Sequence, residues 1–351
     1  MRPIVIDCRF ADRPAGLGRF TRELVSALLQ VAPPETEWIL LVKPGAECWW
    51  PNRAAVRTIE TDIPHYSLAE QTALPRLVPA DAAAFLAPHF NAPLVLGVPT
   101  VVTVHDFILH RYPNDASPLK QLAYRALMRA VVAKAGAVLA VSPFVASEIR
   151  ALYGECIARK TVTTGEGVSD LYSLRPQSEQ DAVRARYGLK RSFLLYVGNT
   201  KEHKNVRGLL DAFARAALPE TDLVLVASGK EADAFAWPTS VIRLHDVPEA
   251  DLPALYSAAA ACVTMTRYEG FGLPLVEALA CGCPVVAPAL TAIPDAVGGA
   301  EGALLLPDLE PETFAAAFRS LPKRPAPRAL HSWDGPAEIV WSALERVSRR
   351  S

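Results

Sequence analysis

Short apolar runs alternate with helical patterns along almost the whole chain, and this alternation restricts the fold more than any other feature. The first half predicts strands at Pro3–Cys8, Trp38–Val42, Ala84–Ala87, Thr100–Val104 and Ala137–Val141, with helices near Phe20–Val31 and Leu119–Ala135. The second half repeats the pattern, with strands at Ser192–Gly198, Asp222–Ala227, Val241–Leu244, Ala261–Met265 and Pro284–Ala287, and helices near Val206–Ala217, Ala250–Ala260, Pro274–Cys281 and Pro311–Leu321. Such alternation predicts an α/β fold built from βαβ units around parallel sheets.

The chain is long enough for two such domains. Its 351 residues exceed the roughly 150 of one ordinary domain. The polar stretch Gly165–Gln180 is the predicted linker, so we expect Rossmann-like, doubly wound domains over 1–170 and 185–330. The segment 332–351 is predicted to be a further helix that packs back on the N-terminal domain. Two such domains imply a deep cleft that both faces line, where ligands of these folds bind.

Charge, cysteine spacing and hydropathy exclude several classes of protein. With a net charge of -1, the chain lacks the overall positive charge that is typical of proteins that bind nucleic acid. The six cysteines form no CxxC pair, and Cys281 and Cys283 are too close in sequence for a zinc knuckle, so we interpret all six as small apolar residues in a reducing compartment. No run of about 18 apolar residues predicts a membrane span. Because no signal-peptide pattern precedes the first strand, we expect a cytoplasmic protein.

The strongest local feature follows the strand Ala261–Met265. The segment 267–272 is a glycine-punctuated loop, Pro274 suits the first turn of a helix, and Gly282 suits its end. Glu269 is predicted on the loop and Glu277 one turn into the helix. The backbone N–H groups that open a helix bind anionic or hydroxyl oxygens, so Gly270, Phe271, Gly272 and Leu273 are candidates for a sugar or phosphate site. An ordinary acidic first turn would explain Glu277 but not Glu269 with the Gly-Phe-Gly loop.

Three further segments stand at carboxyl ends of predicted strands. The loop 198–205 begins with Gly198 and Asn199 and carries Lys201 and Lys204, which either neutralise a diphosphate in place of a metal ion or form a solvated charged loop. Gly16, Gly18 and Arg19 open a predicted helix, but Thr21 interrupts the dinucleotide fingerprint, which argues against a Rossmann dehydrogenase. His105 directly follows the predicted strand Thr100–Val104. It is either a histidine of the hydrophobic core or part of the ligand-binding site.

The helix Leu119–Ala135 carries four basic residues and no acidic one. This composition invites a membrane-surface interpretation. The basic residues Lys120, Arg125, Arg129 and Lys134 nevertheless fall on two sides of the helix, and apolar residues occur nearly all round. We therefore favour a buried helix with charged ends over an interfacial one.

These motifs together resemble glycosyltransferase family 4, a group of retaining enzymes with the GT-B fold. The E-x7-E motif is matched by Glu269 and Glu277 within Tyr268-Glu-Gly-Phe-Gly-Leu-Pro-Leu-Val-Glu277. Gly16-Leu-Gly-Arg-Phe-Thr, Val-His105-Asp106, Ala140-Val-Ser-Pro, Tyr196-Val-Gly-Asn with His-Lys204-Asn, and His331-Ser-Trp333 also look like family counterparts. The resemblance covers nearly the whole chain, and it implies a GT-B fold of two Rossmann-like domains.

The resemblance implies roles for these residues. Glu277 would hold the donor ribose, Glu269 would lie near the anomeric carbon, Lys204 would bind the diphosphate, and His105 would contact the sugar or the phosphate. The main chain at Phe271, Gly272 and Leu273 would complete the sugar site. Asn199 stands where many relatives carry a basic residue, so Lys201 or Arg19 would supply part of the charge.

The implied reaction transfers a hexose, with mannose favoured, from a nucleoside-diphosphate sugar to a saccharide or lipid-linked acceptor, with no cofactor and no metal. It would serve cell-surface polysaccharide synthesis, and a lipid-linked acceptor would require peripheral contact with the inner face of the plasma membrane. The alternatives are a GT-B-fold sugar-nucleotide epimerase and a non-catalytic sugar-nucleotide-binding subunit.

Overall fold

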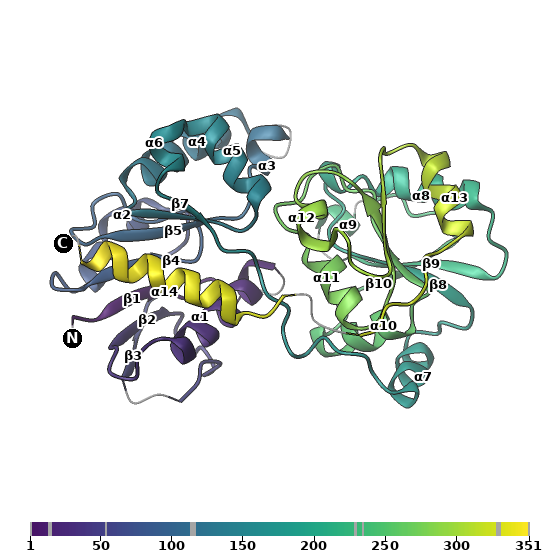
Figure 1. Ribbon diagram of the computed structural model, residues 1–351, viewed down its shortest axis with the longest axis horizontal. Coiled ribbons are helices and arrows are strands. Elements are labelled where there is room, and N and C mark those ends of the chain that lie inside the picture. The colour runs from purple at the N-terminus through teal and green to yellow at the C-terminus, as the bar shows by residue number, and fades with distance from the viewer. Residues whose placement is uncertain are drawn as a thin grey trace. The chain divides into compact units, whose positions relative to one another are not determined.

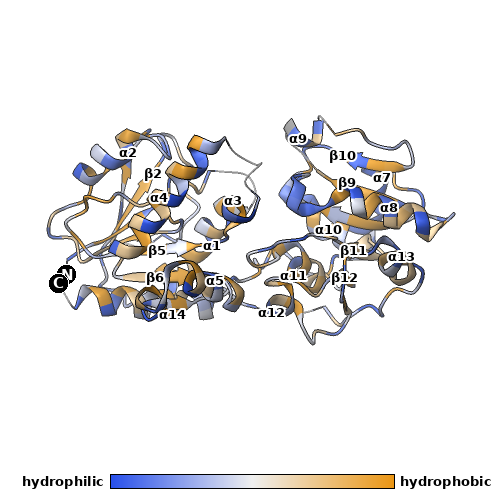
Figure 2. Ribbon diagram, turned by 90° about the horizontal axis from the view of Figure 1, so that it is seen from above, coloured by the Kyte–Doolittle hydropathy of each residue, from blue (hydrophilic) through white to orange (hydrophobic). Residues whose placement is uncertain are grey.

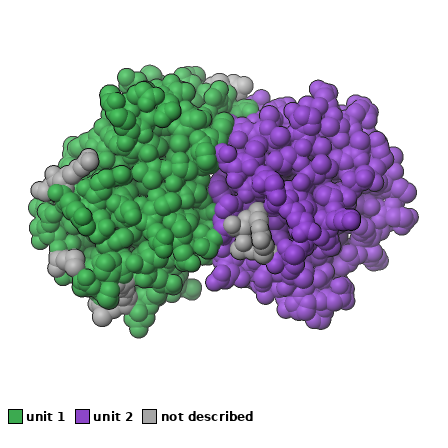
Figure 3. All heavy atoms as spheres, in the orientation of Figure 1, with its two compact units in different colours: residues 1–167, 332–351 green, residues 168–331 purple. Residues whose placement is uncertain are grey.

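A computed structural model describes residues 2–12, 16–52, 55–112, 117–227, 230–233, 235–327 and 331–349 (Figure 1). The chain forms two compact units, coloured separately in Figure 3. Unit 1 comprises Met1–Gly167 together with Ser332–Ser351, and unit 2 comprises Val168–His331. The last segment of the chain therefore belongs to the first unit rather than to its neighbour in sequence.

Unit 1 is built on a seven-stranded parallel sheet of order β3-β2-β1-β4-β5-β6-β7. Its strands are β1 (Ile4–Asp7), β2 (Trp38–Val42), β3 (Val56–Glu60), β4 (Ala84–Ala87), β5 (Thr100–Val104), β6 (Ala137–Ala140) and β7 (Thr161–Thr163). The order reverses between β1 and β4, in register Ile4↔Ala84. This is the doubly wound Rossmann order, in which ligands bind beyond the carboxyl ends of the strands at the reversal.

The helices of unit 1 cover this sheet. They are α1 (Gly16–Val31), α2 (Leu68–Thr72), η1 (Leu74–Leu77), α3 (Ile108–Arg111), α4 (Pro118–Lys134), α5 (Pro143–Tyr153), α6 (Glu155–Ala158) and α14 (Asp334–Ser348). The C-terminal α14, yellow in Figure 1, packs beside α1 and contacts β4, β5 and β6. Its buried Ala337, Val340 and Leu344 follow helical spacing, which gives α14 one apolar face toward the sheet.

Unit 2 repeats the architecture with a six-stranded parallel sheet of order β10-β9-β8-β11-β12-β13. Its strands are β8 (Ser192–Val197), β9 (Thr221–Val226), β10 (Val241–Leu244), β11 (Ala261–Val263), β12 (Val285–Pro288) and β13 (Ala303–Leu306). Its helices are α7 (Gln177–Arg186), η3 (Glu202–Lys204), α8 (Val206–Ala216), α9 (Lys230–Asp233), η4 (Glu249–Asp251), α10 (Leu252–Ala258), α11 (Leu273–Ala280), α12 (Ile293–Val297) and α13 (Pro311–Arg319). The order of strands reverses between β8 and β11, which pair in register Ala261↔Leu194.

The predicted α/β class with two Rossmann-like domains is confirmed, and most of the differences lie in short or polar elements, although the eleven-residue helix α5 was not predicted either. All predicted strands are present within one or two residues at each end, but β3, β7 and β13 were not predicted. α1 begins at Gly16 rather than near Phe20, so the Gly16-Leu-Gly18 segment lies inside the helix and not on a loop before it. α7 begins at Gln177, inside the stretch predicted as a linker.

The interpretation of Leu119–Ala135 as a buried helix is wrong. In α4 only Met128, Val131 and Val132 are buried. The other apolar residues of the helix are exposed or half-buried because α4 meets the rest of unit 1 mainly through its C-terminal half.

Candidate functional site

The loop after β11 holds Glu269 at the reversal of the unit 2 sheet. Gly272, with φ +110°, precedes the first residue of α11, a conformation that side chains rarely adopt. Pro274 occupies the first turn of the helix, and Gly282, with φ +69°, follows its last turn, both as predicted. The Glu269 N–H donates to Thr291 Oγ1 at 3.1 Å, which ties the loop to the next βα connection.

The loop after β8 lies against this first loop. The His203 carbonyl accepts from Arg267 N at 2.7 Å and from Thr266 Oγ1 at 3.2 Å. Buried Tyr196 donates its hydroxyl to the Asn199 carbonyl at 2.6 Å and so fixes the start of the loop. Asn205 ends it in the left-handed region, with φ +50°, immediately before α8. Hydrogen bonds therefore join the two loops at the carboxyl ends of β8 and β11.

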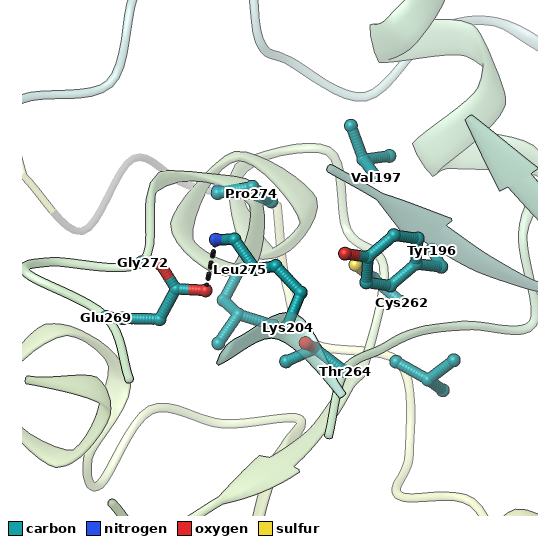
Figure 4. Close-up of a pocket in the computed structure, with 10 residues that line it drawn as sticks. Tyr196, Val197, Lys204, Cys262, Thr264, Glu269, Gly272, Pro274 and Leu275 are labelled. Carbon is teal, nitrogen blue, oxygen red and sulfur yellow. Dashed lines mark hydrogen bonds and ion pairs between the residues drawn. The ribbon is translucent and has the colours of Figure 1, made fainter. Parts of the chain in front are cut away.

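An ion pair joins the two loops. Lys204 Nζ lies 2.6 Å from Glu269 Oε1, and the two side chains are 15% and 17% exposed. Figure 4 shows them pointing toward one another among the residues that line a pocket. The pocket lies at the carboxyl ends of β8 and β11 and is lined by Tyr196, Val197, Lys204, Cys262, Val263, Thr264, Glu269, Gly272, Pro274 and Leu275. Because the pair is only partly screened by water, its charges remain strong inside the pocket.

Glu277 lies one turn inside α11 and is 2% exposed. Its carboxylate accepts a hydrogen bond from the Tyr256 hydroxyl at 3.2 Å, and Tyr256 is itself fully buried on α10. The two glutamates of the motif therefore have different surroundings. Glu269 lines the pocket and is paired with a lysine, while Glu277 is buried within the protein.

A second hollow lies beside the loop after β8. It is lined by Thr200, Lys201, Glu202, Asn205, Val206, Arg207, Phe235 and Arg267. Lys201 is exposed and its N–H donates to Asn199 Oδ1 at 3.1 Å. Lys201 and Lys204 thus face different hollows, although both come from the segment predicted to bind a diphosphate.

In unit 1, His105 follows β5 and is held at both ring nitrogens. Nδ1 lies 3.4 Å from Glu166 Oε1, and Nε2 lies 2.8 Å from the Pro88 carbonyl. Burial, the largest effect, lowers the pKa of His105, but the hydrogen bond to Glu166 and its charge outweigh burial and raise that pKa overall. Both partners accept hydrogen bonds, so this arrangement favours the protonated form of the imidazole.

A buried ionic network lies beside His105 at the reversal of the unit 1 sheet. Arg9 donates to Asp7 Oδ2 at 2.6 Å and to Glu70 Oε1 at 2.7 Å, and Asn91 donates to the same Glu70 oxygen at 2.9 Å. All four residues are at most 2% exposed. The second oxygen of Glu70 accepts the Tyr66 N–H at 2.9 Å and holds Tyr66 at φ +58°.

Comparison with known proteins identifies the family. Residues 45–169 match glycosyltransferase family 4, and residues 191–323 match glycosyl transferases group 1. The chain is 35% identical to O-antigen chain mannosyltransferase B of Escherichia coli over 57% of this chain and 55% of that protein. It is 31% identical to D-inositol 3-phosphate glycosyltransferase 1 of Catenulispora acidiphila over 66% of this chain and 60% of that protein. The chain belongs to glycosyltransferase family 4.

Solved structures of low sequence identity share the fold of this family 4 chain. Sucrose-phosphate synthase from Thermosynechococcus elongatus matches with a TM-score of 0.71 at 20% identity, over 100% of this chain and 97% of that one. Anabaena HepE in complex with UDP and glucose matches with a TM-score of 0.68 at 18% identity, over 100% and 95% of the two chains. These matches confirm the GT-B fold class. The chain spans little more than half the length of the curated relatives named above.

Within this family 4 chain, the predicted residues fall into two groups. Unit 2 brings together Lys204, Glu269, Gly272 and, deeper, Glu277. His105 and the helix start at Gly16, Gly18 and Arg19 lie in unit 1, and Phe20 of that helix contacts the His105 ring edge-on at a centroid distance of 4.4 Å. Glu166 and Tyr256, which hold His105 and Glu277, were not predicted. Glu166 lies in the polar stretch after β7 and Tyr256 inside an apolar helix, so neither follows a motif.

The described part of the chain gathers no group of three or more His, Cys, Asp or Glu side chains that could hold a metal ion. All six cysteines are free thiols in the structure; Cys8, Cys262, Cys281 and Cys283 are buried, whereas Cys48 and Cys156 are exposed. Among the described residues, no helix is both long and apolar enough to cross a membrane.

Proposed function

We propose that the protein is a retaining glycosyltransferase that moves a hexose from a nucleoside-diphosphate sugar to a hydroxyl group of its acceptor. The observation that carries this proposal is the Lys204–Glu269 ion pair over the pocket at the β8–β11 reversal. A doubly wound sheet binds its ligand at this position. The pocket offers a cation for a diphosphate, a carboxylate for a developing positive charge, and the opening turn of α11 for oxygen atoms.

Lys204 would change partner when the donor binds. In the structure its ammonium neutralises Glu269 at 2.6 Å. A diphosphate carries more negative charge than one carboxylate, so it would attract Lys204 and be repelled by Glu269. Binding would therefore release Glu269 toward the sugar ring. In this way the chain's own lysine supplies the positive charge that many phosphate sites take from a metal ion, and we propose that no metal or other cofactor is required.

Retention at the anomeric carbon commonly relies on two close carboxylates and a covalent intermediate. The second glutamate of this site, Glu277, is 2% exposed and hydrogen-bonded to Tyr256, which suits a fixed anchor for the donor ribose better than a nucleophile. We assign Glu269 to electrostatic stabilisation of the oxocarbenium-like centre. The leaving diphosphate would then help to remove the proton of the acceptor hydroxyl on the same face.

The names of relatives guide the choice of substrates. One relative is an O-antigen chain mannosyltransferase, which supports mannose as the transferred sugar and a growing saccharide as the acceptor in cell-surface polysaccharide synthesis. A lipid-linked acceptor would place the protein at the inner face of the plasma membrane, where peripheral contact suffices. The thermal-shift series described next is designed to identify the nucleobase of the donor.

A thermal-shift series tests the donor. Each nucleoside diphosphate and its mannose and glucose conjugates is added to the full-length protein, and ligand that binds the native state raises the melting temperature by mass action. We expect one nucleobase to stand out, with the sugar conjugate at least as stabilising as the diphosphate alone. If every nucleotide leaves the transition unchanged at millimolar concentration, the site is not a donor site.

Glu269→Gln separates chemistry from binding. Removing the carboxylate releases Lys204 and removes repulsion of the diphosphate, so nucleoside-diphosphate affinity should be unchanged or up to about tenfold tighter, while turnover falls on the order of 100-fold. Lys204→Met should instead weaken nucleotide binding. Glu202→Gln, on the same loop but outside the pocket, is the matched control. Near-wild-type turnover in Glu269→Gln would remove Glu269 from the chemistry.

A further inference from the structure

The second hollow of unit 2, beside the loop after β8, has the size of a small-molecule site and a positively charged lining. Its volume is about 380 Å³, within the range of pockets that hold small ligands. Three cationic side chains, those of Lys201, Arg207 and Arg267, line it together with the single carboxylate of Glu202, which leaves a positive excess. All three cationic residues are exposed, and in the described part of the chain none of them forms an ion pair with a carboxylate. The hollow therefore offers unpaired positive charge to an anionic ligand.

The first turn of α8 adds backbone donors to the same hollow. Asn205, which precedes this eleven-residue helix, lines the hollow together with Val206 and Arg207, its first two residues. Asn205 adopts left-handed backbone angles, and its side chain makes no capping hydrogen bond. The first N–H groups of a helix have no partner within the helix and stand at the positive end of its dipole. They therefore favour an anion in addition to the three side-chain charges.

The cations come from three separate elements, and hydrogen bonds fix the backbone of two of them. The Arg267 N–H, on the loop after β11, donates to the His203 carbonyl at 2.7 Å, and Arg267 Nη1 lies 3.5 Å from the Glu202 carbonyl. The Lys201 N–H, on the loop after β8, donates to Asn199 Oδ1 at 3.1 Å. The third cation stands on α8. Charges that converge from three elements on one hollow favour a binding site over a solvated charged loop.

One wall of the hollow is aromatic. Phe235 is half-buried, its ring centroid lies 4.6 Å from that of Trp237, and the guanidinium carbon of Arg207 lies 5.7 Å from the Phe235 centroid. The Trp237 indole N–H donates to the Ala232 carbonyl at 2.8 Å, which holds this wall in place. Figure 2 shows α9, the short helix before Phe235, as mostly hydrophilic, so the ring stands in polar surroundings. An apolar ring beside cations suits a ligand that has a carbon body and an anionic group.

We propose that this hollow is a second ligand site of unit 2 and binds a small phosphomonoester. The phosphate would lie among Lys201, Arg207 and Arg267 at the first turn of α8, and the carbon body would pack on Phe235. A phosphomonoester carries a charge of about -1.5 to -2 at pH 7, which matches the positive excess of the lining. The residue Lys204 lines the other pocket of unit 2, so this proposal does not rest on the proposed transferase activity.

Isothermal titration calorimetry of the full-length protein tests the site, with glucose 6-phosphate and inorganic phosphate as probes. We expect glucose 6-phosphate to bind on the order of 10-fold tighter, because only this probe places carbon atoms on Phe235. Lys201→Met with Arg267→Gln should weaken both probes on the order of 100-fold, since charge-assisted hydrogen bonds to phosphate are strong. Glu202→Gln removes the one carboxylate and should tighten both by about threefold. Phe235→Leu should weaken glucose 6-phosphate and leave inorganic phosphate unchanged.

Matched variants separate this hollow from the other pocket and from the general surface of unit 2. Lys190→Met with Lys323→Met removes two exposed positive charges elsewhere in the unit and should bind both probes as the wild type does. Lys204→Met should keep the affinity for glucose 6-phosphate within about threefold, because that charge belongs to the other pocket. Circular dichroism checks that every variant is folded. The proposal is overturned if neither probe binds at millimolar concentration, if Lys201→Met with Arg267→Gln binds like wild type, or if Lys204→Met loses as much affinity as that pair.

Discussion

At the scale of single residues, His105 shows how its neighbours set the charge of a side chain. Glu166 and the Pro88 carbonyl face its two ring nitrogens, so the protonated ring satisfies both partners and the neutral ring satisfies one. Its edge-on neighbour Phe20 and the His89 ring, 5.9 Å away, close the site from other elements. Asp106 adds a further negative charge that raises the pKa of His105.

The pKa of His105 should fall when Glu166 is neutralised. In the wild type this pKa is raised, so His105 contributes stability that is present below the unfolded value of about 6.5 and is lost as pH rises through the folded pKa. Glu166→Gln should lower the His105 pKa by about one unit or more and reduce stability in acid relative to wild type. Imidazole NMR titration measures the pKa, and His110, whose pKa is about 4, is the internal reference that should not move. An unchanged His105 titration would contradict the assignment.

Tyr256 is a positioning residue for Glu277. Its hydroxyl donates to the buried carboxylate at 3.2 Å, so Tyr256→Phe should cost about 1–2 kcal/mol of stability and raise the KM for the donor more than it lowers kcat. Denaturant unfolding and steady-state kinetics measure the two effects. Tyr153→Phe is the matched control, because the buried Tyr153 hydroxyl has no hydrogen-bond partner in the described part of the chain. Equal losses of stability in the two variants would contradict the assignment.

At the scale of elements, the start of α14 depends on one glycine. A Cβ atom at Gly167 would lie 2.5 Å from Cγ and 2.6 Å from the backbone nitrogen of Trp333, the residue that precedes α14. The packing leaves no space for it, and the backbone nitrogen cannot rotate away as a flexible side chain could. The Trp333 ring in turn contacts Phe20 of α1 at a centroid distance of 5.5 Å.

Gly167→Ala should therefore destabilise unit 1 by about 1–3 kcal/mol. Gly335→Ala, inside α14 and with open space around the new methyl group, should be neutral or stabilise by up to about 1 kcal/mol, because alanine favours the helix. Thermal unfolding of the two variants measures the difference. A Gly167→Ala protein as stable as wild type would show that the Trp333 contact is looser than it is in the structure.

At the scale of the whole molecule, the two units differ in how they are completed. Unit 2 is one continuous segment with its own core, which includes Leu194, Leu223, Val263 and Phe314. Unit 1 is formed from both ends of the chain. Val340 and Leu344 of α14 are fully buried in it, and each large aliphatic side chain contributes about 1.5–3 kcal/mol when buried.

Fragments should reflect this difference. Residues 168–331 should fold alone with a cooperative transition, whereas residues 1–167 should not, because loss of α14 removes an amount of burial comparable with the 5–15 kcal/mol stability of a domain. Joining residues 332–351 to 1–167 through a short flexible linker should restore folding. Circular dichroism and denaturant titration of the three fragments measure this. Cooperative folding of 1–167 alone would mean that α14 is dispensable.

The sequence predicted the buried elements well because burial imposes a simple pattern. β2 and β4 have the predicted bounds, since a central or well-covered parallel strand requires a continuous apolar run. The edge strand β3, with exposed Arg57 and Thr58, carries a polar pattern that does not distinguish it from a loop. Helix α5 was not predicted, although Ser142 is a typical N-cap residue. Its hydroxyl accepts the Val145 N–H at the start of the helix.

The sequence by itself determined the two doubly wound units, the family, and the loop segments that carry Lys204 and Glu269, because these depend on local patterns and on spacing along the chain. Only the tertiary structure decided that Lys204 pairs with Glu269, that Glu166 and Tyr256 hold His105 and Glu277, and that the N-terminal half of α4 faces solvent. Each of these brings together segments from different parts of the chain or depends on which side of an element the core occupies. The periodicity of a sequence defines the faces of a helix, but packing selects the face that is buried.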